Sequence, residues 1–308
     1  MRLLAAAATA AAALAAGSTA AHAPTIAGCP VFPADNPWNQ PVDKLPVAAN
    51  SAAIIASIGD GPVHADFGSG LYDGSFIGIP YVVVHGTTTP KSRVTFDYAD
   101  ESDKGPYPIP RNVPIEGAPQ HADSGDRHAL IVDRDSCRLY ELYALRRQNG
   151  RWAAGSGAMW NLRSNALRPA GWTSADAAGL PILPGLARWD GDASTGVIRH
   201  ALRFTVERTR RAYVYPARHY ASDLTDSNLP PMGLRVRLKA SVDISHLPPQ
   251  ARVVAQAMKT YGMIVADNGS NWFVSGAPSS HWSNDQLHAL GTLHGNDFEV
   301  VDTSSLRP

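Results

Sequence analysis

The sequence predicts a mainly β protein, an antiparallel sandwich or jelly-roll-like single domain with one or two short helices. The 308 residues include 22 Arg but 5 Lys, and 22 Asp but 5 Glu. Because Lys and Glu favour helices whereas Asp favours turns, helix should be scarce. Short apolar runs also follow one another between Gly, Pro, Asn and Asp, without alternating helices, which disfavours Rossmann and TIM-barrel folds.

The charge balance and the hydrophobic content set the class of protein. The 27 Lys and Arg residues balance 27 Asp and Glu residues, and 44% of the residues are hydrophobic. A neutral chain lacks the basic excess that nucleic-acid binding requires, so no nucleic-acid partner is expected. The apolar content is sufficient for a packed core and argues against disorder.

The first 21 residues have the layout of a secretory signal peptide. Arg2 is followed by an uncharged Ala/Leu run and then by small residues. Residues 22–308 are therefore expected to form one secreted β-rich domain, extracellular or periplasmic. No later segment supplies the roughly 18 uncharged apolar residues of a spanning helix, so no membrane span is expected. The oligomeric state is left open.

Two cysteines, Cys29 and Cys137, remain in the mature chain. An even count in an exported protein is most simply read as one disulfide. The bridge would attach the N-terminal arm to the middle of the chain. The alternative is two reduced, buried thiols.

The expected elements follow in chain order. Prolines make residues 24–46 an extended arm, in which Trp38 is an anchor, and residues 48–58 form a short helix. The one strong helix is 248–262, where two prolines precede an amphipathic pattern and Gly262 ends it. An Asn268-Gly269 turn then predicts a hairpin over 262–277, followed by a short helix at 284–290 and a strand at 298–301. Further strands are expected at 77–85, 92–98, 128–132, 138–145, 198–206, 212–215 and 234–238.

Several longer motifs carry a resemblance. The segments NPWN, HADFGSG, GWTSADAAGLPILPGL and PARHYAS stand along the mature chain. On these motifs the chain resembles a family of secreted bacterial proteins of uncharacterised function. The resemblance implies no reaction, cofactor or catalytic residue.

The familiar catalytic motifs are missing from the sequence. It contains no HExxH, GxSxG, P-loop or CxxC motif and no dinucleotide fingerprint. His128, His200 and His219 lack the HxH or HxxxH spacing typical of a metal site. Neither a metal nor a cofactor is therefore expected.

Strand parity indicates candidate catalytic residues. His128 and His200 each begin an RHAL strand, where they share a face with apolar residues. Glu141 is in phase with apolar neighbours in CRLYELYAL, and a half-buried carboxyl group of this kind has the raised pKa of a general acid. The catalytic hypothesis combines Glu141 with Asp176 as a second carboxylate and with His128, His200 and His219 as orienting or proton-transfer groups. The alternative is that each histidine is a satisfied structural residue and that Glu141 pairs with an arginine.

The connection over 155–188 has little periodicity and is expected to be a long functional loop. Trp faces stack on sugar rings, while Asn and Arg exchange hydrogen bonds with hydroxyl groups. The composition therefore suits a glycan cleft, and a loop packed for structural reasons is the alternative. The candidate substrate-binding residues are Trp160, Trp172, Asn161, Arg203 and Arg218.

These patterns favour a secreted carbohydrate-active enzyme, a glycoside hydrolase acting on an extracellular polysaccharide or oligosaccharide. A polysaccharide lyase is an enzymatic alternative. A non-catalytic glycan-binding or envelope-associated module would use the same Trp, Asn and Asp residues without an acid. A purely structural secreted protein is the third class.

Overall fold

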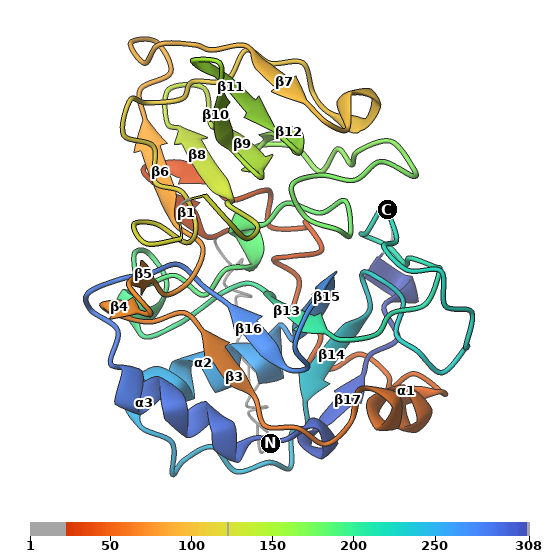
Figure 1. Ribbon diagram of the computed structural model, residues 1–308. Coiled ribbons are helices and arrows are strands. Elements are labelled where there is room, and N and C mark those ends of the chain that lie inside the picture. Colours follow the sequence, from red (N-terminus) through yellow and green to blue (C-terminus); the bar gives the residue numbers. More distant parts are fainter. Residues whose placement is uncertain (1–22, 122, 307–308) are drawn as a thin grey trace, which may run out of the picture.

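A computed structural model of the protein describes residues 23–121 and 123–306. It confirms a mainly β protein, with 26% of residues in strands and 16% in helices. Figure 1 shows two principal sheets, a four-stranded sheet in the upper half and a six-stranded sheet in the lower half. A single sandwich or jelly roll is not confirmed. The predicted signal peptide, residues 1–21, lies outside the described residues.

The four-stranded sheet has the order β12-β9-β8-β6. All five residues of β8, ALIVD, are buried, as expected for a strand covered on both faces. A three-stranded sheet, β10-β11-β7, lies next to it in the chain. The bounds are β6 (Tyr81–Val84), β7 (Val94–Phe96), β8 (Ala129–Asp133), β9 (Arg138–Tyr143), β10 (Arg146–Gln148), β11 (Arg151–Ala154) and β12 (Ser156–Asn161).

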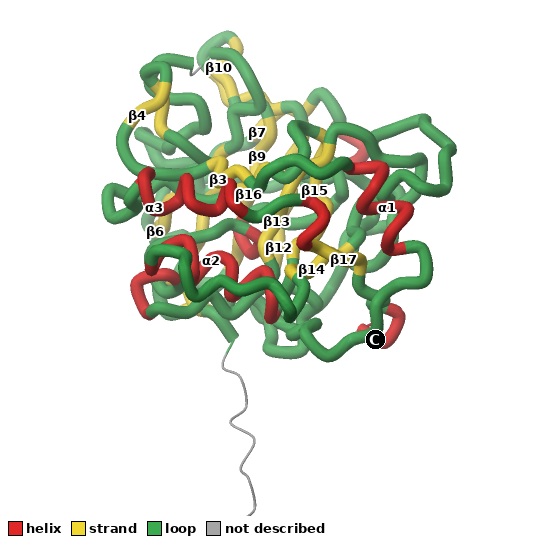
Figure 2. Tube along the Cα trace, turned by 90° about the horizontal axis from the view of Figure 1, so that it is seen from below, coloured by secondary structure: helices red, strands yellow, loops and turns green. Residues whose placement is uncertain are grey.

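The six-stranded sheet has the order β17-β14-β15-β13-β16-β3. Three α-helices lie around it, and loops make up much of the remaining chain (Figure 2). The bounds are β3 (His64–Asp66), β13 (Leu202–Val206), β14 (Arg235–Leu238), β15 (Met263–Asn268), β16 (Phe273–Ser275), β17 (Phe298–Val300), α1 (Ser51–Ile58), α2 (Pro249–Thr260) and α3 (Asn284–His288).

The remaining elements are short. Two-stranded sheets pair β1 (Thr25–Ile26) with β2 (Cys29–Pro30) and β4 (Leu71–Tyr72) with β5 (Ser75–Phe76). Single 3-10 turns are η1 (Ala99–Glu101), η2 (Leu183–Gly185), η3 (Ala193–Thr195), η4 (Ala289–Thr292), η5 (Gly295–Asp297) and η6 (Ser304–Leu306). All three expected helices form, with shifted ends.

The topology corrects three expectations. The sheets are mixed rather than antiparallel, because β6 is parallel to β8, β13 to β15 and β16 to β3. The predicted hairpin is wrong, since β15 and β16 do not pair with each other and both flank β13. Residues 212–215 form only an isolated bridge from Tyr213 to Met232, and the predicted loop 155–188 begins with strand β12.

One hydrophobic core joins the two principal sheets. It includes Leu130 and Leu139 from the upper sheet together with Phe204, Val265 and Val274 from the lower sheet. A smaller core packs beneath β10, β11 and β7 and contains Tyr107 and Leu142. The single-domain assignment of 22–308 stays a prediction.

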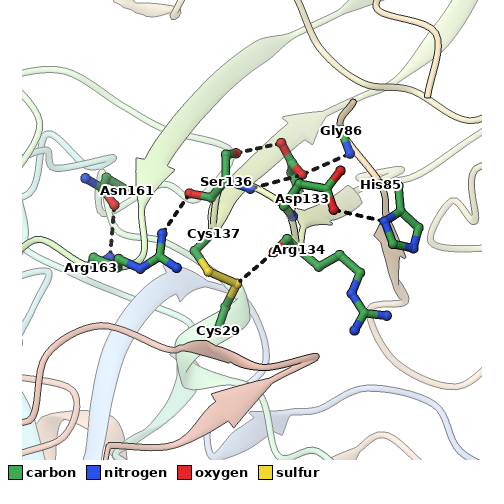
Figure 3. Close-up of a disulfide and its surroundings, with 10 residues drawn as sticks. Cys29, His85, Gly86, Asp133, Arg134, Ser136, Cys137, Asn161 and Arg163 are labelled. Carbon is green, nitrogen blue, oxygen red and sulfur yellow. Dashed lines mark hydrogen bonds and ion pairs between the residues drawn. A yellow bond between two sulfur atoms is a disulfide. The ribbon is translucent and has the colours of Figure 1, made fainter. Parts of the chain in front are cut away.

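The predicted disulfide between Cys29 and Cys137 is confirmed. The two Cα atoms lie 5.4 Å apart (Figure 3), within the usual range for a bridge. The bond attaches β2 to the β8–β9 turn, where Asp133 accepts hydrogen bonds from Gly86 N and from Ser136. A disulfide is compatible with secretion. None of the helices within 23–121 and 123–306 combines the length and apolar character needed to cross a bilayer.

Candidate functional site

A cavity of about 420 Å³ is lined by residues from both principal sheets. Tyr143 at the end of β9 and Ser156 at the start of β12 are partners across the upper sheet. Asp267 and Asn268, the last two residues of β15, line the cavity from the lower sheet. Acidic groups from two loops, Asp126 and Glu101, complete a polar lining.

The loop from 173 to 177 forms one wall of the cavity and is held rigidly. Ser156 Oγ donates to Ser174 O at 2.5 Å, and Ser174 Oγ donates to Leu180 O at 2.6 Å. Arg168 binds the same loop from outside, because its Nε donates to Thr173 O and its Nη1 donates to Asp103 at 2.6 Å. The wall is therefore built from satisfied backbone groups and not from a mobile flap.

His128 lies behind this wall as a buried cation. Its Nδ1 is 2.5 Å from a carboxylate oxygen of Glu116, and its Nε2 is 2.9 Å from Ala175 O. Since both ring nitrogens face acceptors, the doubly protonated imidazolium fits the site. Burial alone would lower the pKa of His128, but the charge and hydrogen bond of Glu116 raise it to about 9. His128 therefore orients the loop and is poorly suited to act as a base.

Arg203 connects two aspartates of the site. Its Nη2 lies 3.4 Å from Asp176 Oδ1 and 4.0 Å from Asp267 Oδ2, and its Nη1 donates to Ser275 Oγ at 2.7 Å. The two carboxyl groups are thus close neighbours at the same nitrogen of one buried guanidinium. Burial raises the pKa of Asp176 to about 7 against the attraction of Arg203.

Asp176 and Asp267 differ in their access to the cavity. The side chain of Asp176 has 0% exposed surface, whereas that of Asp267 is 27% exposed. Burial also raises the pKa of Asp267, against the attraction of Arg203 and His128. Asp267 is therefore the half-buried acid that a ligand can reach, while Asp176 positions Arg203 from behind.

His219 contributes the one imidazole of the cavity lining. Its Nδ1 lies 2.8 Å from Ala177 O, so it carries a proton and donates to that carbonyl. The ring stacks on Tyr220 at 5.7 Å between centroids. These two contacts fix the ring and leave Nε2 as the nitrogen that can accept a proton.

Glu141 has a different environment from the one expected. It is fully buried and accepts hydrogen bonds from Ile182 N, Leu183 N and Trp160 Nε1 at 2.9 to 3.2 Å. Burial raises its pKa to about 7, although these donors oppose the shift. It does not line the cavity. The contacts favour a structural role, in which Glu141 binds the start of η2 to strand β9.

His200 is also part of a structural network. Its Nε2 lies 3.1 Å from Asp192 Oδ2, which is 2.7 Å from Arg188 Nη2, and all three side chains are buried. Its Nδ1 faces Ala201 O at 2.8 Å. His200 therefore lies away from the cavity lining, in contrast to the predicted proton-transfer role.

The five predicted substrate-binding residues do not line the cavity. Trp160 is buried against Glu141, and Trp172 is half-buried with Arg168 near its ring. Asn161 is exposed at the end of β12, near the disulfide, where it accepts from Arg163 N (Figure 3). Arg203 is buried, and Arg218 donates to Arg168 O. The burial of Trp160 argues against stacking on a sugar ring.

Within residues 23–121 and 123–306, one group of side chains has ligand atoms close enough for a metal ion. Atoms of Glu116, Asp126 and His128 all lie within 4.8 Å of one another. The 2.5 Å contact between His128 and Glu116 is a hydrogen bond, however, and Nε2 of His128 is occupied by Ala175 O. This arrangement leaves no imidazole nitrogen free for an ion.

Of the sequence candidates, Asp176 and His219 reach the cavity lining, whereas Glu141, His128 and His200 lie outside it. Sequence reasoning missed Asp267, Asp126 and Glu101. Asp267 did carry a signal, since it is an acidic residue at the end of a buried strand, just before an Asn-Gly turn. Asp126 and Glu101 stand in polar segments that resemble ordinary turns.

A scan against protein-family models and searches of curated proteins and of solved structures find no match for this chain. The resemblance carried by its long motifs therefore stays a hypothesis. The chemistry of the site has to be argued from its own geometry.

Proposed function

We propose that this protein is a secreted glycoside hydrolase that cleaves an extracellular polysaccharide in the cavity between its two sheets. Asp267 is the general acid, and Asp126 is the second carboxylate. The observation that carries the proposal is a cavity lined by two neighbouring carboxyl groups in different environments, one half-buried and one exposed. Glycoside hydrolysis uses such a pair.

The surroundings of Asp267 suit an acid. Its raised pKa keeps a larger fraction of the carboxyl group protonated near neutrality. The proton passes to the glycosidic oxygen as the bond to the anomeric carbon breaks. The exposed carboxylate of Asp126 then either attacks that carbon or takes a proton from a water molecule that does so. His219 Nε2 supplies a further acceptor on the cavity wall.

The lining favours a hydrolase over a lyase and over a binding module. A lyase must neutralise the carboxylate of a uronic acid, but the described residues that line the cavity include neither Arg nor Lys. A binding module would present flat aromatic platforms, yet Trp160 is buried and Trp172 is half-covered. Tyr98 and Tyr143 offer smaller aromatic surfaces on the cavity itself.

The test is product release by the purified mature chain from a panel of polysaccharides. New reducing ends indicate hydrolysis, and new unsaturated ends indicate a lyase. Asp267→Asn should lower kcat by about 100-fold or more, the contribution of a general acid. Because the acid must be protonated, wild-type turnover should fall as the pH rises through its raised pKa.

Asp223→Asn is the matched control. Its side chain is 96% exposed and outside the cavity, so turnover should stay within about twofold of wild type. Asp126→Asn should lose turnover as Asp267→Asn does. Full activity in Asp267→Asn, or no product from any polysaccharide, would overturn the proposal.

A further inference from the structure

We propose that the cavity selects a positively charged amino sugar, with Glu101 as the partner of its ammonium group. This inference rests on the proposed hydrolase function and names the class of its substrate. The sugar is a glucosamine-type residue with a free amino group, as in a deacetylated aminoglycan. Glu101 acts as a specificity residue and takes no part in bond cleavage.

The first argument is the charge of the lining. Four carboxyl groups line the cavity, from Glu101, Asp126, Asp176 and Asp267, and His219 is the one basic side chain among the lining residues. Two buried guanidinium groups lie behind the lining: Arg203 beside Asp176 and Asp267, and Arg168, which donates to the backbone O of Glu101 at 2.6 Å. The attraction for a cation comes mainly from Glu101 and Asp126, because Asp267 is the protonated acid and burial raises the pKa of Asp176 to about 7.

The second argument is the position of Glu101. Thr173 N donates to its Oε2 at 2.8 Å, which fixes the side chain at the cavity. Among the described residues, Oε1 has no hydrogen-bond partner. Tyr98, three residues earlier, is 55% exposed and lines the same cavity. A carboxylate next to an aromatic ring is a favourable site for an ammonium group.

The third argument comes from Asp176. Its side chain is fully buried in the cavity wall, and its Oδ2 lacks a hydrogen-bond partner. Arg203 approaches only the other oxygen. A buried carboxyl oxygen without a donor is an unmet acceptor in the cavity wall, which the N–H groups of an ammonium ion could satisfy.

The experiment measures binding and cleavage separately. Tetramers of glucosamine, N-acetylglucosamine and glucose are titrated into Asp267→Asn, which is designed to bind without turnover, at low and high salt. Wild type is assayed for cleavage of the same tetramers. The glucosamine tetramer should bind at least about tenfold more tightly than the other two, with the difference reduced by salt. Glu101→Gln should reduce the ratio of affinities for the glucosamine and neutral tetramers by about tenfold, the value of one charge-assisted hydrogen bond. Asp223→Asn should leave it unchanged.

The outcomes separate the inference from the function on which it rests. Cleavage of neutral tetramers without preference for glucosamine would overturn the inference and leave the hydrolase intact. Selective binding of glucosamine without cleavage would overturn the hydrolase and support the inference. Unchanged selectivity in Glu101→Gln would overturn the role of Glu101.

Discussion

The buried pair of His128 and Glu116 predicts how the stability of the protein depends on pH. Raising the pKa of His128 from 6.5 to about 9 corresponds to about 3 kcal/mol of stabilisation. The sign follows from a folded-state pKa above the unfolded value. The contribution is complete below pH 6.5 and is lost as the pH rises to 9. Glu116→Gln keeps the side-chain volume but removes the charge that maintains the imidazolium.

We therefore expect Glu116→Gln to lower the free energy of unfolding by about 3 kcal/mol at pH 6 and by much less at pH 9.5. Chemical denaturation at both pH values, with the disulfide intact, measures the difference. Asp73→Asn is the matched control, because it removes the carboxylate partner of His121 in an exposed pair. The side chain of Asp73 is 80% exposed and that of His121 is 46% exposed. That control should change the unfolding midpoint little at either pH.

Comparison with wild type at each pH removes most of the contribution of other groups with raised pKa values, such as Asp176 and Glu141, because they are kept in the variant. Equal destabilisation by Glu116→Gln at pH 6 and pH 9.5 would refute the reasoning. It would mean that the loss comes from packing and that His128 is neutral in the folded protein. An NMR titration of the His128 ring should then show a pKa well below 9.

Three further predictions concern the scaffold. Replacing Cys29 and Cys137 by Ser should lower the free energy of unfolding in denaturant by up to about 4 kcal/mol, because the bridge spans 108 residues. Glu141→Gln should lower the free energy of unfolding by about 1 to 3 kcal/mol, because the new side-chain NH2 group would be buried without a hydrogen-bond acceptor. Turnover per folded molecule should stay unchanged, and a loss would restore Glu141 as a catalytic candidate. Gly157→Ala should lower Tm and reduce the free energy of unfolding by about 1 to 3 kcal/mol. The reason is that the new Cβ would lie 2.5 Å from Tyr107 Oη. An unchanged Tm would contradict this close packing.

Much of the fold could be predicted from local patterns. The amphipathic helix α2, the fully buried strand β8 and the paired cysteines could be predicted from periodicity, composition and compartment. Strand pairing could not be predicted in the same way. The Asn268-Gly269 signal indicated a hairpin, but β13, more than fifty residues earlier, lies between the two strands. A long-range pairing outweighs a favourable turn when the inserted strand is buried.

The candidate site was harder to predict because burial and access are tertiary properties. Sequence reasoning correctly selected Glu141 as a buried carboxyl group with a raised pKa. It could not show that η2 would present two backbone N–H groups to that carboxylate, which makes the residue structural. An acid inside an apolar strand can therefore have a catalytic or a structural role, and the segment that packs against it determines which.

A β-bulge explains why Asp267 escaped attention. Regular alternation places Asp267 on the face of Val265, opposite to the face of Ile264. In the structure, Ile264 pairs with Arg203 and Val265 with Phe204, but the register then shifts so that Thr205 pairs with Asp267. Paired residues on neighbouring strands share a face, so the extra residue moves Asp267 to the side of Arg203. One inserted residue thus carries the carboxyl group from the expected face to the cavity, where burial raises its pKa against the attraction of Arg203.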